Sequence, residues 1–212
     1  MSTRIKICGV TQADDAARVA AAGADFIGLN FWPKSRRHVA PERARMLAAA
    51  ARSAGGAKLV GVFVDPELAD ILAVAGELDA IQLHGDESPE ACARIARETG
   101  KPVWKALPVK LARDVEHLEL WPVEAVLLDA PVPGRGGAGV AFDWELAREA
   151  RRRHPARLIV LAGGLTPETV AGAIATVDPW AVDVASGVEA APGIKDAAKV
   201  AAFVAAVRAQ SR

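Results

Sequence analysis

The stretch LIVLAGGLTPETVAGA, residues 158 to 173, contains one complete unit of the pattern that organises this sequence. It begins with the apolar run Leu158–Leu161, passes through Gly163 and Gly164, and reaches Thr166, which proline and glutamate follow. Threonine can cap a helix, proline presets the first helical φ, and glutamate suits the positive end of the helix dipole. An alanine-rich segment comes next. The stretch therefore predicts a strand, a turn and a helix.

The same unit recurs along the whole chain. Short apolar runs of strand type each precede a turn and an alanine-rich segment of helix type. The eight runs are Arg4–Cys8, Phe26–Asn30, Leu59–Phe63, Ala80–Leu83, Val103–Ala106, Ala125–Leu128, Leu158–Leu161 and Ala181–Val184. Strands that alternate with helices pair in parallel through right-handed crossovers.

Several helix starts are visible in the sequence. Asp65-Pro66-Glu67 and Ser88-Pro89-Glu90 repeat the chemistry of the opening stretch, and Ala40-Pro41-Glu42 lacks only the polar cap. Thr11 with Asp14 predicts a capping box. Asp143 is expected to cap the helix after it, and a last helix is expected over about residues 195–209.

Eight units in 212 residues predict an α/β fold, a single-domain (β/α)8 TIM barrel that spans residues 1–212. The alternative is an open doubly wound sheet. No G-x-G-x-x-G motif follows the first run, which argues against the dinucleotide-binding version of that fold. No linker-like stretch divides the chain, so we expect one domain.

Composition narrows the class of protein. The 26 basic and 26 acidic residues balance, so no overall positive field attracts nucleic acid. The cysteines, Cys8 and Cys92, are too few for a disulfide framework and indicate a reducing compartment, the cytoplasm. We expect no membrane span and no signal peptide, because no apolar stretch has the required length. Cys92 lies in an expected helix and is interpreted as a core residue.

In a barrel of this kind, reactive groups lie at the carboxyl ends of the strands. Asp129 follows the sixth run and is a candidate acid or base, or else a helix cap or a partner in a salt bridge. Cys8 ends the first run and is a candidate for catalysis, although free cysteine is often only a small buried apolar residue. His84 can line the pocket or hold its loop by hydrogen bonds, and we include it among the substrate-binding candidates. No cluster has the spacing of metal ligands, so no metal site is predicted.

Glycines follow the last two runs. Gly163, Gly164, Ser186 and Gly187 would let backbone N–H groups approach a phosphate, although simple turn chemistry also explains them. The glycine-rich loop at residues 133–139 is either a lid over a ligand or a plain turn.

Alternation along the first run places Arg4, Lys6 and Cys8 on one face. The other face is apolar and should meet the helices, so Lys6 is expected inside the barrel, where it would favour the thiolate of Cys8. A buried lysine needs a partner, and Asp183 on the eighth run is the expected one.

After the second run, Arg36 and Arg37 stand near Trp32. They could clamp a carboxylate next to an aromatic ring, or they could form a solvated basic loop.

Seven motifs together carry a resemblance to a known family. KICGVT, FWPKSRRHV, VGVFVD, IQLHGDESPE, LLDAPVPGRGGAGVAFDW, LAGGLTPETV and DVASGVEAAPGIKD occur in order from end to end of the chain. They resemble the phosphoribosylanthranilate isomerases of tryptophan biosynthesis. The resemblance implies an Amadori rearrangement of N-(5-phosphoribosyl)anthranilate to 1-(2-carboxyphenylamino)-1-deoxyribulose 5-phosphate. It implies a small-molecule phosphoribosyl substrate and no cofactor. The apolar helices are compatible with either a monomer or a homodimer.

Matched motif by motif, the resemblance makes Cys8 the general base and Asp129 the general acid. It assigns the anthranilate contact to Arg37 and the phosphate to the turns around Gly163, Gly164, Ser186 and Gly187. Arg36 and His38 stand where the family often has proline and tyrosine, so either arginine could hold the carboxylate. Ala138 and Ala185 replace a common threonine and a common serine.

Two other functions remain to be weighed. A related phosphosugar isomerase of histidine biosynthesis would use paired aspartates on the first and fifth strands, where this sequence has Cys8 and Lys105. A non-catalytic phosphate-binding barrel would retain Cys8 and Asp129 only by coincidence.

Overall fold

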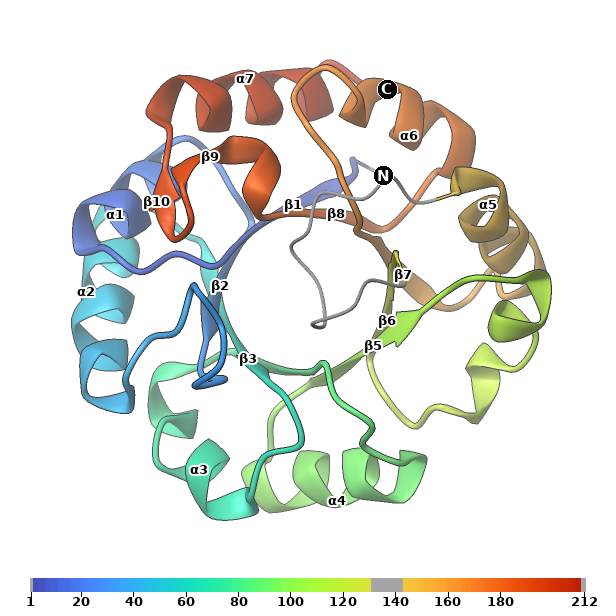
Figure 1. The fold of residues 1–212 in the computed structure, drawn as a ribbon, viewed down its shortest axis with the longest axis horizontal. Coiled ribbons are helices and arrows are strands. Elements are labelled where there is room, and N and C mark those ends of the chain that lie inside the picture. Colours follow the sequence, from blue (N-terminus) through green and yellow to red (C-terminus); the bar gives the residue numbers. More distant parts are fainter. Residues whose placement is uncertain (1, 131–142, 211–212) are drawn as a thin grey trace.

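Eight parallel strands close into a barrel, and helices surround it (Figure 1). The structure is a computed structural model that describes residues 2–130 and 143–210. The barrel strands are β1 Arg4–Cys8, β2 Phe26–Asn30, β3 Lys58–Phe63, β4 Ala80–Leu83, β5 Val103–Pro108, β6 Ala125–Asp129, β7 Leu158–Leu161 and β8 Ala181–Val184. All eight predicted runs are confirmed as strands, and three of them are longer than predicted. The (β/α)8 fold is confirmed, and the open sheet is excluded because β8 pairs with β1.

The helices between the strands are shorter and less regular than the strands. The α-helices are α1 Ala13–Ala21, α2 Ala44–Ala54, α3 Leu68–Leu72, α4 Pro89–Thr99, α5 Trp144–Arg153, α6 Val170–Val177 and α7 Ala197–Arg208. The described residues also contain five 3-10 turns: η1 Pro41–Arg43, η2 Ala75–Glu77, η3 Ala112–Val115, η4 Leu118–Leu120 and η5 Ser186–Val188. No helix among the described residues is both long and apolar enough to cross a membrane.

Two of the predicted helix caps are confirmed. Ser88 accepts a hydrogen bond from the backbone N–H of Ala91 at the start of α4, and Asp143 accepts one from Glu145 at the start of α5. The predicted start at Pro41 is a 3-10 turn that runs into α2.

The other predicted starts are wrong because their side chains serve tertiary contacts or turns. Thr11 does not cap α1; its hydroxyl donates to the carbonyl of Gly193 at 2.8 Å. Asp65 has a positive φ of 46°, and its carboxylate accepts from the backbone N–H of Asp86, so α3 begins only at Leu68. Thr166 lies in a turn before α6, which begins four residues later than this threonine, at Val170.

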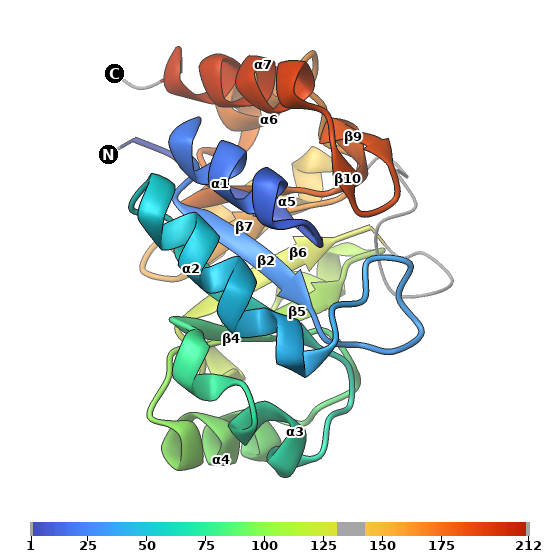
Figure 2. The ribbon, with the colours of Figure 1, turned by 90° about the vertical axis from the view of Figure 1, so that its left-hand side faces the viewer.

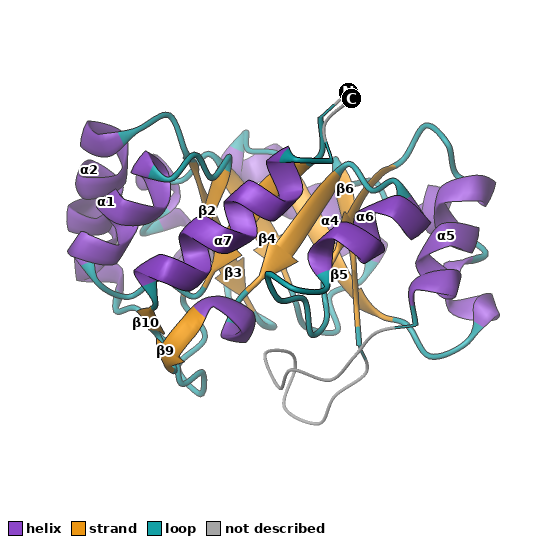
Figure 3. Ribbon diagram, turned by 90° about the horizontal axis from the view of Figure 1, so that it is seen from above, coloured by secondary structure: helices purple, strands orange, loops and turns teal. Residues whose placement is uncertain are grey.

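A small antiparallel hairpin, β9 Glu189–Ala191 with β10 Ile194–Lys195, was not predicted. Because Lys195 belongs to this hairpin, the last helix begins at Ala197 and is capped by Asp196. The hairpin and the loop after β2 project from the same end of the barrel (Figure 2). The carboxyl end of α7 lies at the opposite end (Figure 3), where Arg208 donates to the carbonyl of Thr3 at 3.2 Å.

The core has two layers, as the alternation along strands requires. The larger one lies between the strands and the helices. The smaller one fills the barrel interior and combines two large aromatic residues with smaller apolar ones: Phe26, Val60, Ala80, Trp104, Ala106, Ala125, Leu127, Val160, Ala162 and Ala181. This set identifies the inward position of each strand from β2 to β8.

Candidate active site

The barrel interior changes from apolar to polar toward the carboxyl ends of the strands. Ala80, Leu127 and Ala181 face the barrel interior. The residues two positions further along each strand face the same way, because side chains alternate along a strand. These residues are Gln82, Asp129 and Asp183. By the register of β1 with β8, Lys6 lies beside Asp183, so Lys6 and Cys8 also face inward. Ionisable and nucleophilic side chains are therefore collected at one mouth of the barrel.

The thiol of Cys8 lies next to the ammonium group of Lys6, above a glycine. Gly28 of β2 is the register partner of Cys8. A Cβ atom added to Gly28 would stand 2.7 Å from Cys8 Sγ and 3.1 Å from Lys6 Nζ. Lys6 is fully buried and donates to Asp183 Oδ1 at 2.9 Å, so the predicted pair of Lys6 with Asp183 is confirmed.

The charges around Cys8 act in opposite directions. Burial raises the pKa of the Cys8 thiol above its ordinary value. Lys6 acts the other way, as does Lys195 more weakly, while the charge of Asp183 adds to the rise. The expectation that Lys6 would favour the thiolate is right in sign, but it does not decide the outcome, because removing the sulfur from water costs the charged form more.

Asp129 ends β6 and contacts His84, the residue that follows β4. Asp129 Oδ2 lies 3.5 Å from His84 Nε2, and Asp129 Oδ1 accepts from the backbone N–H of Ala130 at 2.8 Å. Gln82 Nε2 is 3.1 Å from His84 Nδ1, so Gln82, His84 and Asp129 form a row. Among the described residues, Gln82 Oε1 is a buried oxygen without a hydrogen-bond partner, which a ligand hydroxyl can satisfy.

Of the two candidate arginines, only Arg37 has a partly buried side chain that is fixed by a partner at this end of the barrel. Arg37 Nε and Nη2 donate to the two carboxylate oxygens of Glu189 at 2.8 and 2.7 Å. The side chain of Arg37 is 13% exposed, whereas Arg36 is exposed. Glu189 holds the pKa of Arg37 above its ordinary value through this pair.

The turns after β7 and β8 come close to each other. Gly163 and Gly164 have φ values of 86° and 68°, which side-chain-bearing residues rarely adopt. A Cβ on Gly187 would overlap the carbonyl oxygen of Leu165, so this glycine allows the contact of the two turns. Within the described residues, the N–H groups of Gly163, Gly164, Ser186 and Gly187 have no protein acceptor, as an anion site requires.

A family model described as N-(5′-phosphoribosyl)anthranilate isomerase matches residues 5–206, nearly the whole chain. The chain belongs to this isomerase family. A member from Ralstonia nicotianae is 46% identical over 216 aligned residues, which cover 97% of this chain and 93% of that one.

Solved isomerase structures have the same fold. The crystal structure of phosphoribosyl anthranilate isomerase from Thermotoga maritima superposes with a TM-score of 0.88 at 42% identity, and it covers 98% of this chain and 99% of that one. A structure of the isomerase in complex with reduced 1-(o-carboxyphenylamino)-1-deoxyribulose 5-phosphate gives a TM-score of 0.85 at 41% identity, with the same coverage.

One interpretation from the sequence, the position of Lys105, is corrected by the structure. Lys105 does not occupy an interior position, because the inward residues of β5 are Trp104 and Ala106. Lys105 Nζ instead donates to the carbonyl of Gly85 and to Glu87 Oε2, at 2.6 and 2.7 Å. The comparison with the histidine-pathway isomerase still holds, since β5 contains no aspartate.

Some residues at this end of the barrel were not identified from the sequence, and one feature that the sequence predicts cannot be compared with the structure. The predicted lid at residues 133–139 lies outside the described residues. Glu189, Lys195, Gly28 and Gln82 were not singled out, although Glu189 and Lys195 stand in the motif DVASGVEAAPGIKD. Their roles arise from contacts between distant strands, and neither spacing nor periodicity carries that information.

Proposed function

We propose that this protein isomerises N-(5′-phosphoribosyl)anthranilate to 1-(2-carboxyphenylamino)-1-deoxyribulose 5-phosphate, a step of tryptophan biosynthesis. The observation that carries the proposal is the position of Cys8 and Asp129. They are the last residues of β1 and β6, and both face the interior at the same mouth of the closed barrel. The non-catalytic alternative leaves this pairing unexplained.

In the proposed mechanism, Asp129 is the general acid. It delivers a proton to the ribose ring oxygen while the anilino nitrogen supplies electrons, so that the ring opens to a protonated Schiff base. His84, beside Asp129, is proposed to contact the substrate at this end of the site.

Cys8 is the proposed general base. The Schiff base acidifies the C2′–H bond, and the thiolate removes that proton to form an enolamine. Formation of the ketone then adds a proton at C1′ and releases the proton of the C2′ hydroxyl. Protons gained at O4′ and C1′ equal those lost from C2′ and its hydroxyl, so the overall reaction is an isomerisation.

The two ends of the substrate have separate proposed sites. Arg37 would bind the anthranilate carboxylate, because guanidinium and carboxylate groups match as planar forks. The N–H groups of Gly163, Gly164, Ser186 and Gly187 would bind the phosphate. This division leaves the sugar between them, where Cys8 and Asp129 lie.

Loss of anthranilate-ribotide fluorescence on addition of the protein tests the activity. Cys8→Ser and Asp129→Asn are each expected to lower kcat by about 100-fold or more, since each removes one proton-transfer group. Binding of the reduced product analogue, measured by calorimetry, should persist in both variants. Turnover close to that of the unsubstituted protein in either variant would contradict the role of that residue, and an inactive parent protein would contradict the function itself.

A further inference from the structure

We propose that Glu189 and Lys195 of the β9–β10 hairpin are positioning residues that fix the guanidinium group of Arg37 for an aromatic carboxylate. The inference rests on the proposed function and adds to it the device that sets specificity for the carboxylated ring. Neither residue needs to touch the substrate.

The first observation is the geometry of the fork. Glu189 accepts from Nε and Nη2 of Arg37, which occupies one edge of the guanidinium plane. Arginine has five N–H donors, so three remain, and two of these lie parallel on the edge between Nη1 and Nη2. A second carboxylate can bind that edge in the same bidentate way. Glu189 thus orients the plane and leaves one complete fork for a ligand.

The second observation is the space made for the arginine stem. Gly9, which follows the proposed base Cys8, has a φ of 74°, and a Cβ there would overlap Arg37 Cδ. The side chain of Arg37 therefore crosses directly over the backbone at the end of β1. Its low exposure and its fixed partner mean that little rotamer freedom is left to lose when a ligand binds.

The third observation is the position of Lys195. Its ammonium group donates to Glu189 Oε1 at 2.9 Å, to the carbonyl of Cys8 at 2.6 Å and to that of Ala185 at 3.2 Å. These contacts join the hairpin to the ends of β1 and β8. The buried ammonium group of Lys195 therefore connects the proposed base Cys8, the start of the proposed phosphate-binding turn after β8 and, through Glu189, the side chain of Arg37.

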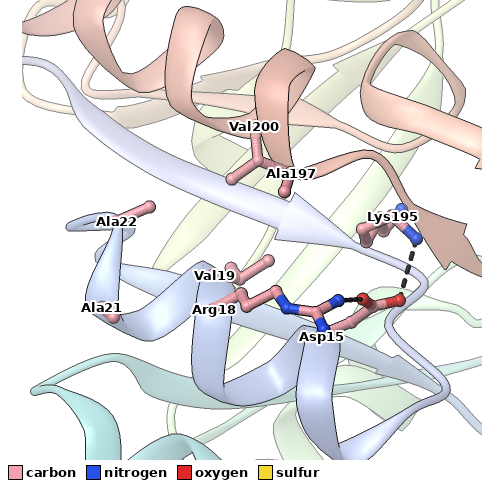
Figure 4. A pocket seen from close by; sticks show the side chains of 8 residues that line it. All are labelled: Asp15, Arg18, Val19, Ala21, Ala22, Lys195, Ala197 and Val200. Atoms are coloured by element: carbon pink, nitrogen blue, oxygen red, sulfur yellow. Dashed lines mark hydrogen bonds and ion pairs between the residues drawn. The ribbon is translucent and has the colours of Figure 1, made fainter.

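The backbone of Lys195 is itself anchored from outside the barrel. Its N–H donates to Asp15 Oδ2 of α1 at 2.8 Å. Figure 4 shows this contact at the edge of a pocket of about 300 Å³ between α1 and α7. The hairpin is thus held on both sides.

Charge also fits the role. Arg37, Lys195 and Glu189 together carry one net positive charge, enough for one carboxylate. Burial acts to raise the pKa of Glu189, but Arg37 and Lys195 outweigh it and hold that pKa below its ordinary value, so Glu189 is ionised. Both carboxylate oxygens of Glu189 therefore accept hydrogen bonds from Arg37, and an uncharged residue at position 189 would lose one of these two bonds.

The test compares two probes: the reduced product analogue, and the same molecule without the ortho carboxyl group. Glu189→Gln is expected to weaken binding of the carboxylated analogue about ten- to 100-fold, the range for a misplaced charged hydrogen bond, and to change binding of the other analogue less than twofold. Added to Arg37→Ala, the same substitution should change binding of the carboxylated analogue less than twofold. Equal weakening for both analogues, or none, would overturn the inference.

Two further variants keep the test decisive. Arg37→Lys retains the positive charge but loses the planar pair of donors. It should therefore weaken binding of the carboxylated analogue selectively, and this result can be measured even if Glu189→Gln fails to fold. Binding like that of the unsubstituted protein would refute the positioning role. Asp25→Asn is the matched control, because Asp25 pairs with Arg208 at 2.8 Å at the opposite end of the barrel, and it should leave both affinities unchanged. Absence of isomerase activity in the unsubstituted protein would instead reject the proposed function.

Discussion

At the scale of single residues, Cys8 is a thiol under opposing influences. Burial and Asp183 raise its pKa, and Lys6 lowers it. If its thiolate is the base, the enzyme works with a small reactive fraction at neutral pH, since the pKa lies above the ordinary 9.0. The fraction grows as the pH rises, because deprotonation produces the active form.

We therefore predict that kcat/KM rises with pH through the neutral range and does not level off below pH 9, the ordinary thiol value. Asp183→Asn should lower the midpoint pH of this rise, which corresponds to the deprotonation of Cys8, because it removes a negative charge near the sulfur. The rate of Cys8 alkylation by iodoacetamide against pH reports the same midpoint without substrate.

Lys6→Met provides the opposite case and should raise the alkylation midpoint. Both variants are best made with Cys92→Ala, since burial raises the pKa of Cys92 to about 11 and its signal would overlap. Midpoints that move together in the two variants would contradict this account of the thiol.

At the scale of elements, the contact between β1 and β2 explains why a glycine stands in the middle of the mostly apolar strand β2. Gly28 pairs in register with Cys8, and the absent side chain leaves room for the thiol and the ammonium group of Lys6. Glycine in a strand interior often marks such a close approach.

Gly28→Ala is expected to lower kcat about tenfold or more, because the new Cβ would lie 2.7 Å from Cys8 Sγ and must displace it. If Cys8 is the proposed base, even a small displacement of its thiol is costly. Steady-state kinetics and thermal unfolding would be measured together. Gly76→Ala is the control, since a Cβ there meets nothing within 4 Å. Equal kinetics in the two variants would show that the space above Gly28 is not needed.

Strands and helix starts differ in how well the sequence predicts them. The strands follow from apolar runs that are buried on both faces, and all eight were predicted. Helix starts depend on where a polar side chain finds its partner. Ser88 finds one locally and caps α4, whereas Thr11 and Asp65 bond to distant backbone and do not cap.

At the scale of the whole molecule, an aromatic cluster closes the other end of the barrel. Phe26, Trp104 and Trp180 pack with ring centroids 4.9 to 5.6 Å apart, and the guanidinium of Arg4 lies over Trp180. Trp104 is 1% exposed and fills space that the alanines of neighbouring strands leave open. A few aromatic side chains among small apolar ones thus pack the barrel interior at the end opposite the polar mouth.

Trp104→Ala should destabilise the protein by about 3–5 kcal/mol, because the cavity would lie inside a closed barrel that cannot collapse around it. Urea unfolding followed by circular dichroism measures this. Trp144→Ala, on the half-buried face of α5, should cost less. A larger loss for Trp144→Ala would contradict the expectation that a cavity inside the closed barrel costs more than one at the surface of α5.

The sequence by itself determined the strand and helix pattern, the barrel, and the resemblance that selected Cys8, Asp129 and Arg37. These depend on local periodicity and on motifs that are continuous in the chain. Only the tertiary structure decided what surrounds those residues. Closure of the barrel places Asp183 beside Lys6, Gly28 beneath Cys8, and Glu189 with Lys195 around Arg37. Such contacts join residues up to 187 positions apart, and their energies depend on burial and distance, which a linear pattern does not contain.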